Sequence, residues 1–176
     1  MKKQNKDIKK IEKMLGLDDI APRNREEVIK YNKKIVNKLL KGVKATKVEI
    51  AYDGGGDNGQ VESVKILKGK KEISVKGVQV TLYQCQNDWT SNGFKEKVIK
   101  ETQGVENALE NFAYTLLEGI PYDWINNDGG YGTVTLDVKT NKVNLDHNQR
   151  EYTYNDEEGH EDDEPEVEIT NHCEEW

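Results

Sequence analysis

The spacing of apolar residues along the chain separates helical from extended segments. Apolar side chains recur every three or four positions between Asn24 and Gly42, which predicts an amphipathic helix. Asn24 can act as the N-cap of this helix, with Glu27 completing a variant of the capping box. A shorter repeat of the same kind over residues 8–15 predicts a helix before it. Because lysines fill much of the remaining surface, we expect two basic N-terminal helices.

The period changes to two beyond residue 46, which is typical of strands that bury one face. The clearest signal is a hairpin with a Thr140-Asn141 turn. Residues 86–104 follow neither period, and we expect some helix near residues 94–100. The alternating segments are residues 47–52, about 60–67, 78–83, 132–138 and 142–147.

A wide apolar stripe predicts a further helix over Val105–Leu117, which Gly119 and Pro121 end. We therefore predict an α+β fold, in which an antiparallel sheet of about five or six strands packs on this helix. The expected parts are a basic helical segment over residues 1–44, an α+β core domain over residues 45–154, and an acidic, disordered tail over residues 155–176.

Charge is distributed unevenly between the two ends of the chain. Residues 1–47 contain 15 Lys/Arg against 6 Asp/Glu, whereas residues 151–176 contain 12 Asp/Glu and no Lys/Arg. The basic end suits a nucleic acid and the acidic end suits a basic protein partner, although the two ends could also attract each other. Within the tail, residues 167–170 are apolar enough to form a terminal strand.

The sequence offers no means of crossing a membrane. No apolar run is long enough to span a bilayer, and no secretory signal follows the first lysines. Cys85 and Cys173 show neither metal-binding nor disulfide-framework spacing, which suits a reducing compartment. We therefore expect a cytoplasmic protein that does not bind membranes.

The stretch Tyr52–Gln60, which reads YDGGGDNGQ, combines two carboxylates with four glycines. Glycines let the backbone approach an anion closely, and Asp53 and Asp57 carry the oxygen ligands that Mg²⁺ or Ca²⁺ prefers. The spacing fits neither an EF-hand, nor a phosphate loop, nor a dinucleotide fingerprint. A connection between strands, with Asp side chains bonded to their own backbone, explains the same residues.

A second loop of similar composition, Asn127–Gly132, precedes the strand at residue 132. If the two loops meet at one end of the sheet, Asp53, Asp57 and Asp128 come together. Their repulsion would then raise carboxyl pKa values or require a cation. One hypothesis is therefore a divalent-metal site on these three residues, occupied by Mg²⁺ or Ca²⁺.

His147 is the one histidine outside the acidic tail. Alternation along its strand places it on the apolar face and Asp146 on the other, so these neighbours do not form an acid–base pair. Two interpretations remain: a hydrogen-bonded core histidine, and a group that assists chemistry at the two loops.

Taken in order, the two loops, the helix between them and the strand ending Leu145-Asp146-His147-Asn148 resemble a bacterial, plasmid and phage family of uncharacterised domains. Its pattern is a YDGxGDxGQ loop, a helical segment, an NDGGxG loop and a terminal LxHN strand, and the resemblance covers about residues 45–150. It implies a recurring domain without an established activity. The matching positions are Asp53, Gly54, Gly56, Asp57, Gly59, Gln60, Asp128, Gly129, Gly130, Gly132, His147 and Asn148.

We predict a non-enzymatic binding protein of a bacterium or mobile element that acts on a protein partner or a host-defence component. The charge polarity favours this function, and no recognisable catalytic set opposes it. Two alternatives stay open: a metal-dependent enzyme or module centred on the Asp/Gly loops, and a nucleic-acid binder that uses the lysines of residues 1–47.

Overall fold

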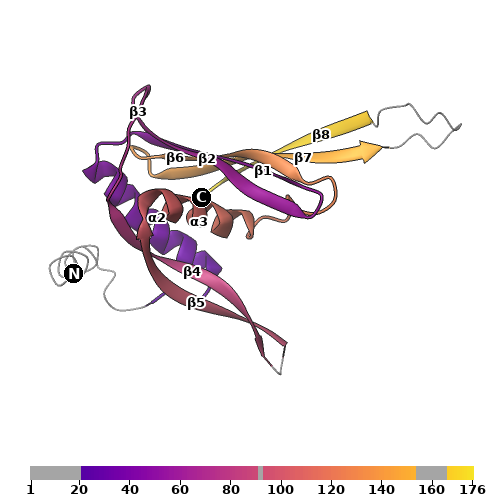
Figure 1. Cartoon of the computed structure of the whole chain (residues 1–176), viewed down its shortest axis with the longest axis horizontal. Helices are drawn as coiled ribbons and strands as arrows, with labels where there is room; N and C mark the ends of the chain where they lie inside the picture. The colour runs from indigo at the N-terminus through magenta and orange to yellow at the C-terminus, as the bar shows by residue number, and fades with distance from the viewer. Residues whose placement is uncertain (1–20, 91–92, 154–165) are drawn as a thin grey trace, which may run out of the picture. The chain divides into compact units, whose positions relative to one another are not determined.

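The structure, a computed structural model, describes residues 21–90, 93–153 and 166–176. Within these ranges the protein is α+β, with a six-stranded antiparallel sheet in the order β3-β2-β1-β6-β7-β8 and a two-stranded sheet, β4-β5 (Figure 1). The helices are α2 (Arg25–Gly42) and α3 (Val105–Leu117). The strands are β1 (Lys47–Gly55), β2 (Asn58–Lys68), β3 (Lys71–Glu72), β4 (Gln79–Thr90), β5 (Gly93–Gly104), β6 (Gly130–Asp137), β7 (Lys142–Thr153) and β8 (Glu166–Glu175).

The chain forms two compact units, each built from separate stretches of sequence. One unit contains the described residues up to Leu39 together with Val75–Gly119. The other contains Leu40–Ser74 and Ile120–Trp176, and therefore the whole six-stranded sheet.

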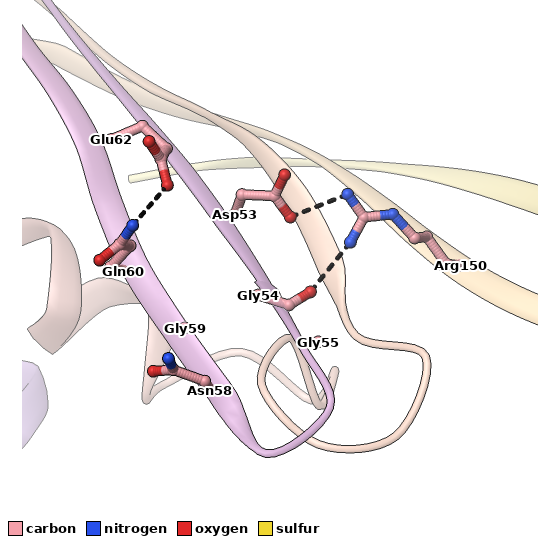
Figure 2. Close-up of a pocket in the computed structure, with 8 residues that line it drawn as sticks. All are labelled: Asp53, Gly54, Gly55, Asn58, Gly59, Gln60, Glu62 and Arg150. Carbon is pink, nitrogen blue, oxygen red and sulfur yellow. Dashed lines mark hydrogen bonds and ion pairs between the residues drawn. The ribbon is translucent and has the colours of Figure 1, made fainter.

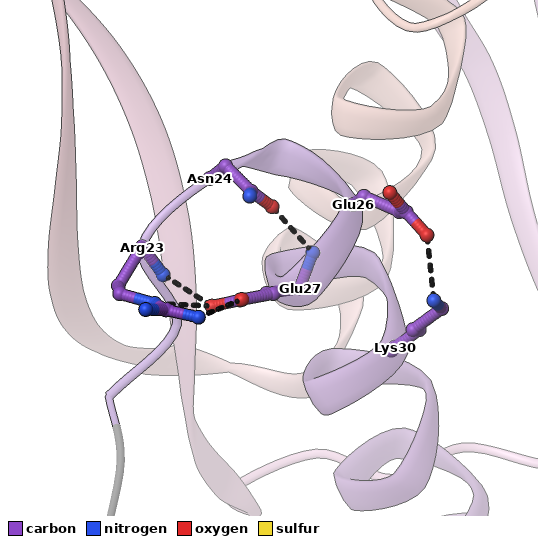
Figure 3. A network of polar contacts seen from close by, with 5 residues as sticks. All are labelled: Arg23, Asn24, Glu26, Glu27 and Lys30. Atoms are coloured by element: carbon purple, nitrogen blue, oxygen red, sulfur yellow. Dashed lines mark hydrogen bonds and ion pairs between the residues drawn. The ribbon is translucent and has the colours of Figure 1, made fainter.

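Helix α2 begins where its sequence predicts (Figure 3). The Asn24 side chain accepts a hydrogen bond from the Glu27 N–H at 2.9 Å, as an N-cap does. The Glu27 carboxylate turns back toward the preceding residue, where it accepts from the Arg23 N–H and pairs with the Arg23 guanidinium, both at 2.8 Å. Exposed pairs of this kind add little energy, so the main effect of the network is to fix the first turn.

The expectation of two N-terminal helices is corrected by the structure. In the described part of the chain one helix, α2, precedes the large sheet. The other predicted helix, over residues 8–15, lies outside the described residues.

The two-stranded sheet is joined to both helices of its unit. The buried Asn32 side chain on α2 donates to the Tyr83 carbonyl at 2.7 Å and accepts from the Tyr83 N–H at 3.0 Å. Tyr31 and Tyr83 pack edge to face beside this pair. Helix α3 contacts both strands, and its Asn111 donates to Gln103 of β5 at 2.7 Å.

The prediction for residues 86–104 was wrong, because residues 86–90 and 93–104 are extended rather than irregular or helical. Strands β4 and β5 pair in continuous register from Gln79 opposite Gly104 to Thr90 opposite Gly93. Polar residues such as Gln86 and Asp88 are exposed, so no apolar period marks the distal half of this ribbon. The cross-strand backbone hydrogen bonds, which no local pattern reveals, define it instead.

The six-stranded sheet has one buried face and one half-exposed face. On β1, residues with buried side chains alternate with more exposed ones. Val134 and Leu136 of β6 and Val143 and Leu145 of β7 continue the buried face, which we call the inner face. The opposite, outer face carries mainly hydroxyl, amide and charged side chains. This alternation confirms the predicted strands at residues 47–52 and the predicted hairpin.

From residue 166 onward, the acidic C-terminal segment is more ordered than the sequence predicts. Strand β8 pairs with β7 over ten residues, from Asn144 opposite Glu175 to Thr153 opposite Glu166. The expected strand at residues 167–170 is therefore part of a longer one, and the part of the predicted tail from residue 166 onward is a sheet edge. No helix in the described ranges is long and apolar enough to cross a membrane.

Asn32→Ala should lower the free energy of unfolding by about 1–3 kcal/mol, because it leaves the part-buried N–H and C=O of Tyr83 without their Asn32 partner. Urea unfolding followed by circular dichroism measures the change. Lys34→Ala, at an exposed position on the same helix, is the control and should change stability by about 0.5 kcal/mol or less. Equal effects of the two substitutions would contradict the importance of this contact.

Candidate functional site

The YDGGGDNGQ stretch is a β-hairpin tip. Strands β1 and β2 pair as far as Gly55 opposite Asn58, which leaves Gly56 and Asp57 as a two-residue turn. Both turn residues have positive φ, 60° and 73°, the backbone that a right-twisting two-residue hairpin requires. Glycine and aspartate tolerate this conformation, so the local sequence accounts for the turn.

The two Asp/Gly loops meet, which is the arrangement that the sequence left open. The Gly56 N–H donates to the Asn127 carbonyl at 2.7 Å. Gly129, with φ of 65°, packs so closely on Gly54 that a Cβ at Gly129 would overlap the Gly54 carbonyl oxygen. The loops are therefore joined through their backbones.

On the inner face, Tyr52 reaches His147 across an intervening strand. Gly132 of β6 lies opposite Tyr52 of β1 on one side and opposite His147 of β7 on the other. The Tyr52 hydroxyl is 2.7 Å from His147 Nδ1. A Cβ at Gly132 would lie 2.8 Å from that hydroxyl, so the contact depends on the glycine.

His147 is fully buried, with 0% of its surface exposed, and its polar atoms are paired. Its Nε2 is 3.1 Å from the Gln149 side-chain oxygen, and the Gln149 amide donates to the Gly129 carbonyl at 2.9 Å. The contacts are satisfied when Tyr52 donates to Nδ1 and a neutral imidazole donates from Nε2. Burial, assisted by His172, lowers the pKa of His147, and burial raises the pKa of Tyr52, so both groups favour their neutral forms.

Aromatic side chains cover this hydrogen bond. The Trp124 ring packs edge to face on Tyr52, with ring centroids 5.4 Å apart. A Cβ at Gly59 would lie 2.6 Å from the Trp124 ring, and one at Gly54 would lie 2.9 Å from it. Tyr122 stacks on His147. The glycines of the hairpin thus provide the flat surface on which Trp124 lies.

On the outer face, Arg150 of β7 reaches over β6 to β1. Its guanidinium donates to the Asp53 carboxylate at 2.8 Å and to the Gly54 carbonyl at 2.9 Å. It lies over the Tyr131 ring of β6, 4.7 Å from the ring centroid. Arg150 therefore braces the hairpin from the face opposite to Tyr52.

A shallow pocket of about 270 Å³ opens between Arg150 and β2 (Figure 2). Figure 2 shows the Asp53–Arg150 pair on one side of it and a hydrogen bond from Gln60 to Glu62, 2.9 Å long, on the other. Its lining comes from Asp53, Gly54, Gly55, Asn58, Gly59, Gln60, Glu62 and Arg150.

The meeting of the loops does not bring their carboxylates into one ligand set. Within residues 21–90, 93–153 and 166–176, no group of three His, Cys, Asp or Glu side chains is placed to hold a metal ion. Asp53 instead pairs with Arg150, and Asp57 is exposed at the hairpin tip. This geometry lends no support to the proposed Mg²⁺ or Ca²⁺ site on Asp53, Asp57 and Asp128.

The other predicted residues have different surroundings. Gly130 lies beneath the His147 ring, where a Cβ would overlap Cε1. Asn148, on the outer face, accepts from Asn171 of β8 at 2.9 Å. Lys34 and Lys41 of α2 are exposed, whereas Lys30 pairs with Glu26 (Figure 3). Nucleic-acid binding through residues 1–47 stays a prediction.

Sequence reasoning missed Arg150 and Glu62. Arg150 follows Asp146 and Asn148 at intervals of two on the outer face of β7, so strand alternation could have placed it. Glu62 lies at a register shift between β1 and β2, where Ala51 pairs with Ser63 but Tyr52 pairs with Val61. Such a bulge has no reliable sequence signal.

The fold and the site together define a small α+β protein in which two Asp/Gly loops pack against a buried tyrosine–histidine pair. The chain belongs to a family of unknown function, DUF6878, whose sequence model matches residues 28–161. This match confirms the resemblance to a family of uncharacterised domains. Neither a curated protein nor a solved structure matches the chain.

Gly130→Ala should destabilise the protein by about 1–3 kcal/mol, because the added methyl group overlaps the buried His147 ring. Gly42→Ala is the matched control, since a Cβ there meets nothing within 4 Å, and it should change stability by about 0.5 kcal/mol or less. Thermal and urea unfolding measure both variants. A Gly130→Ala protein as stable as the control would show that the ring is not confined as described.

Stability should fall as the pH decreases below the ordinary histidine value of 6.5, because the pKa of His147 is lowered in the folded state. In that range the unfolded chain binds the proton more readily, so the slope of the unfolding free energy approaches about 1.4 kcal/mol per pH unit. Urea titrations between about pH 7 and pH 5 test this. His147→Gln should flatten the slope and His172→Gln should retain it; the reverse result would assign the effect to His172.

Proposed function

We propose that the protein is a non-enzymatic binding protein that takes up an extended segment of a partner polypeptide as an additional strand along β2. The observation that carries the proposal is a strand edge without a neighbour beside the pocket. Among the described residues, β3 pairs with only Leu67 and Lys68 of β2. The Ile73 N–H also donates to the Ile66 carbonyl, so the part of this edge that we propose for main-chain hydrogen bonds is centred on Val64.

The direction of the peptide groups on β2 supports this geometry. The Ile73 N–H donates to the Ile66 carbonyl at 2.8 Å, so the peptide groups of Ile66 face away from β1. The Thr46 N–H donates to the Leu67 carbonyl from the other side. Because these directions alternate along a strand, the N–H and C=O of Val64 point to the same open side as those of Ile66.

The setting of the motif residues also supports binding rather than catalysis. Asp53 is paired with Arg150, and His147 is buried and hydrogen bonded to Tyr52, so both act on the arrangement of the strands. The Asp53–Arg150 pair holds the hairpin from its outer face, and the Tyr52–His147 pair holds it from its inner face. A binding site on such a fixed element loses less conformational entropy when a partner binds. The partner expected from the sequence, a protein, suits an edge of this kind.

Val64→Pro should abolish the binding of extended peptides, because proline removes the N–H that points to the open side and cannot receive a neighbouring strand. The full-length chain is immobilised and used to select peptides from a random library. The binding of the recovered peptides is then measured by fluorescence anisotropy. Val64→Thr is the matched control, since it keeps both the branched shape and the N–H. Wild type and Val64→Thr should bind alike.

A second measurement covers the case in which Val64→Pro unfolds. In hydrogen exchange on the wild-type chain, the Val64 amide should exchange more slowly once a selected peptide is added. The proposal fails if no peptide is enriched, if peptides bind folded Val64→Pro as tightly as Val64→Thr, or if the Val64 amide gains no protection.

A further inference from the structure

We infer that the pocket beside β2 selects a basic side chain, lysine or arginine, from the added segment. The inference rests on the proposed function, since it concerns the residue that such a strand would place over the hairpin. It names the partner as a polypeptide with a cationic residue in extended backbone.

Charge in the pocket is unbalanced toward the negative. Two carboxylates, Asp53 and Glu62, face one guanidinium, that of Arg150. Arg150 has its hydrogen bonds on Asp53 and the Gly54 carbonyl, and its side chain is only 20% exposed. The Asp53 side chain is 50% exposed. An incoming cation therefore meets the exposed Glu62 carboxylate, whereas an anion meets a guanidinium that is already paired with Asp53.

The bulge in β2 directs Glu62 to this place. Glu62 has no partner on β1, because the register shifts between Ala51 and Tyr52. Its exposed carboxylate accepts a hydrogen bond from the Gln60 amide, and Glu62 belongs to the lining of the pocket. A bulge on an edge strand often changes the direction of one side chain, and here that side chain is the carboxylate of Glu62.

The reach required also favours lysine and arginine. A strand added to β2 would lie about 4.8 Å from it, so its side chain must cross one strand spacing to reach Glu62 on β2, whereas Asp53 on β1 lies a second spacing away. The long stems of lysine and arginine cover that distance. Gly54, Gly55 and Gly59 contribute only backbone to the lining.

Four acetylated and amidated peptides of alternating threonine and valine, differing only in a central Lys, Arg, Gln or Glu, are the probes. The Lys and Arg peptides should bind the full-length chain about three- to tenfold more tightly than the Gln peptide, and the difference should shrink at high salt. Glu62→Gln should remove the preference. Glu72→Gln makes the same charge change on β3, away from the pocket, and should keep it.

Charge reversal gives the strongest test. Glu62→Lys should prefer the Glu peptide to the Lys peptide, with Val64→Pro again blocking all four. Equal binding of the four peptides to the wild type would overturn this inference and leave strand addition intact. The absence of binding by every peptide would instead count against the proposed function itself, so the two failures are distinguishable.

Discussion

The hydrogen bond from Tyr52 to His147 is the interaction on which the rest of the site depends, because it crosses a strand that lies between its two partners. It exists only where that strand carries no side chain, at Gly132. Burial keeps both groups neutral, and Gln149 extends the polar chain from His147 to the backbone of the Asn127–Gly132 loop. The centre of the sheet and the loop at its end are thereby connected.

The Asp/Gly motifs are better explained by this packing than by a ligand set. Gly54 and Gly59 accommodate Trp124, Gly130 accommodates His147, and Gly129 allows the loops to touch. On the outer face, Arg150 likewise connects β7 to Asp53 of β1 by reaching over Tyr131 of β6. The hairpin of β1 and β2 is therefore fixed from both sides, while the far edge of β2 has no paired strand along most of its length in the described residues.

Elements with strong local signals could be predicted from sequence. The cap at Asn24, the stripe of Val105–Leu117 and the alternation around Thr140 each depend on near neighbours. The two-stranded ribbon of β4 and β5 could not be predicted from sequence, because its distal residues are polar and its order comes from cross-strand pairing. The meeting of the loops could be raised as a possibility from their composition, but Arg150 was overlooked as the partner of Asp53, and their distance in sequence explains why.

The order of strands has a consequence for how the chain folds. Strand β1 is central, but its neighbour β6 follows the entire β4-β5-α3 segment, and their register joins Lys47 to Asp137. During synthesis the β1–β2 hairpin must therefore wait, with the β6 side of the apolar strand β1 unpaired, until the ribosome has passed residue 137. Closure over so long a separation is slow, and a waiting apolar strand can pair with another chain. A truncated product ending before β6 would therefore be a source of aggregation rather than a smaller working domain.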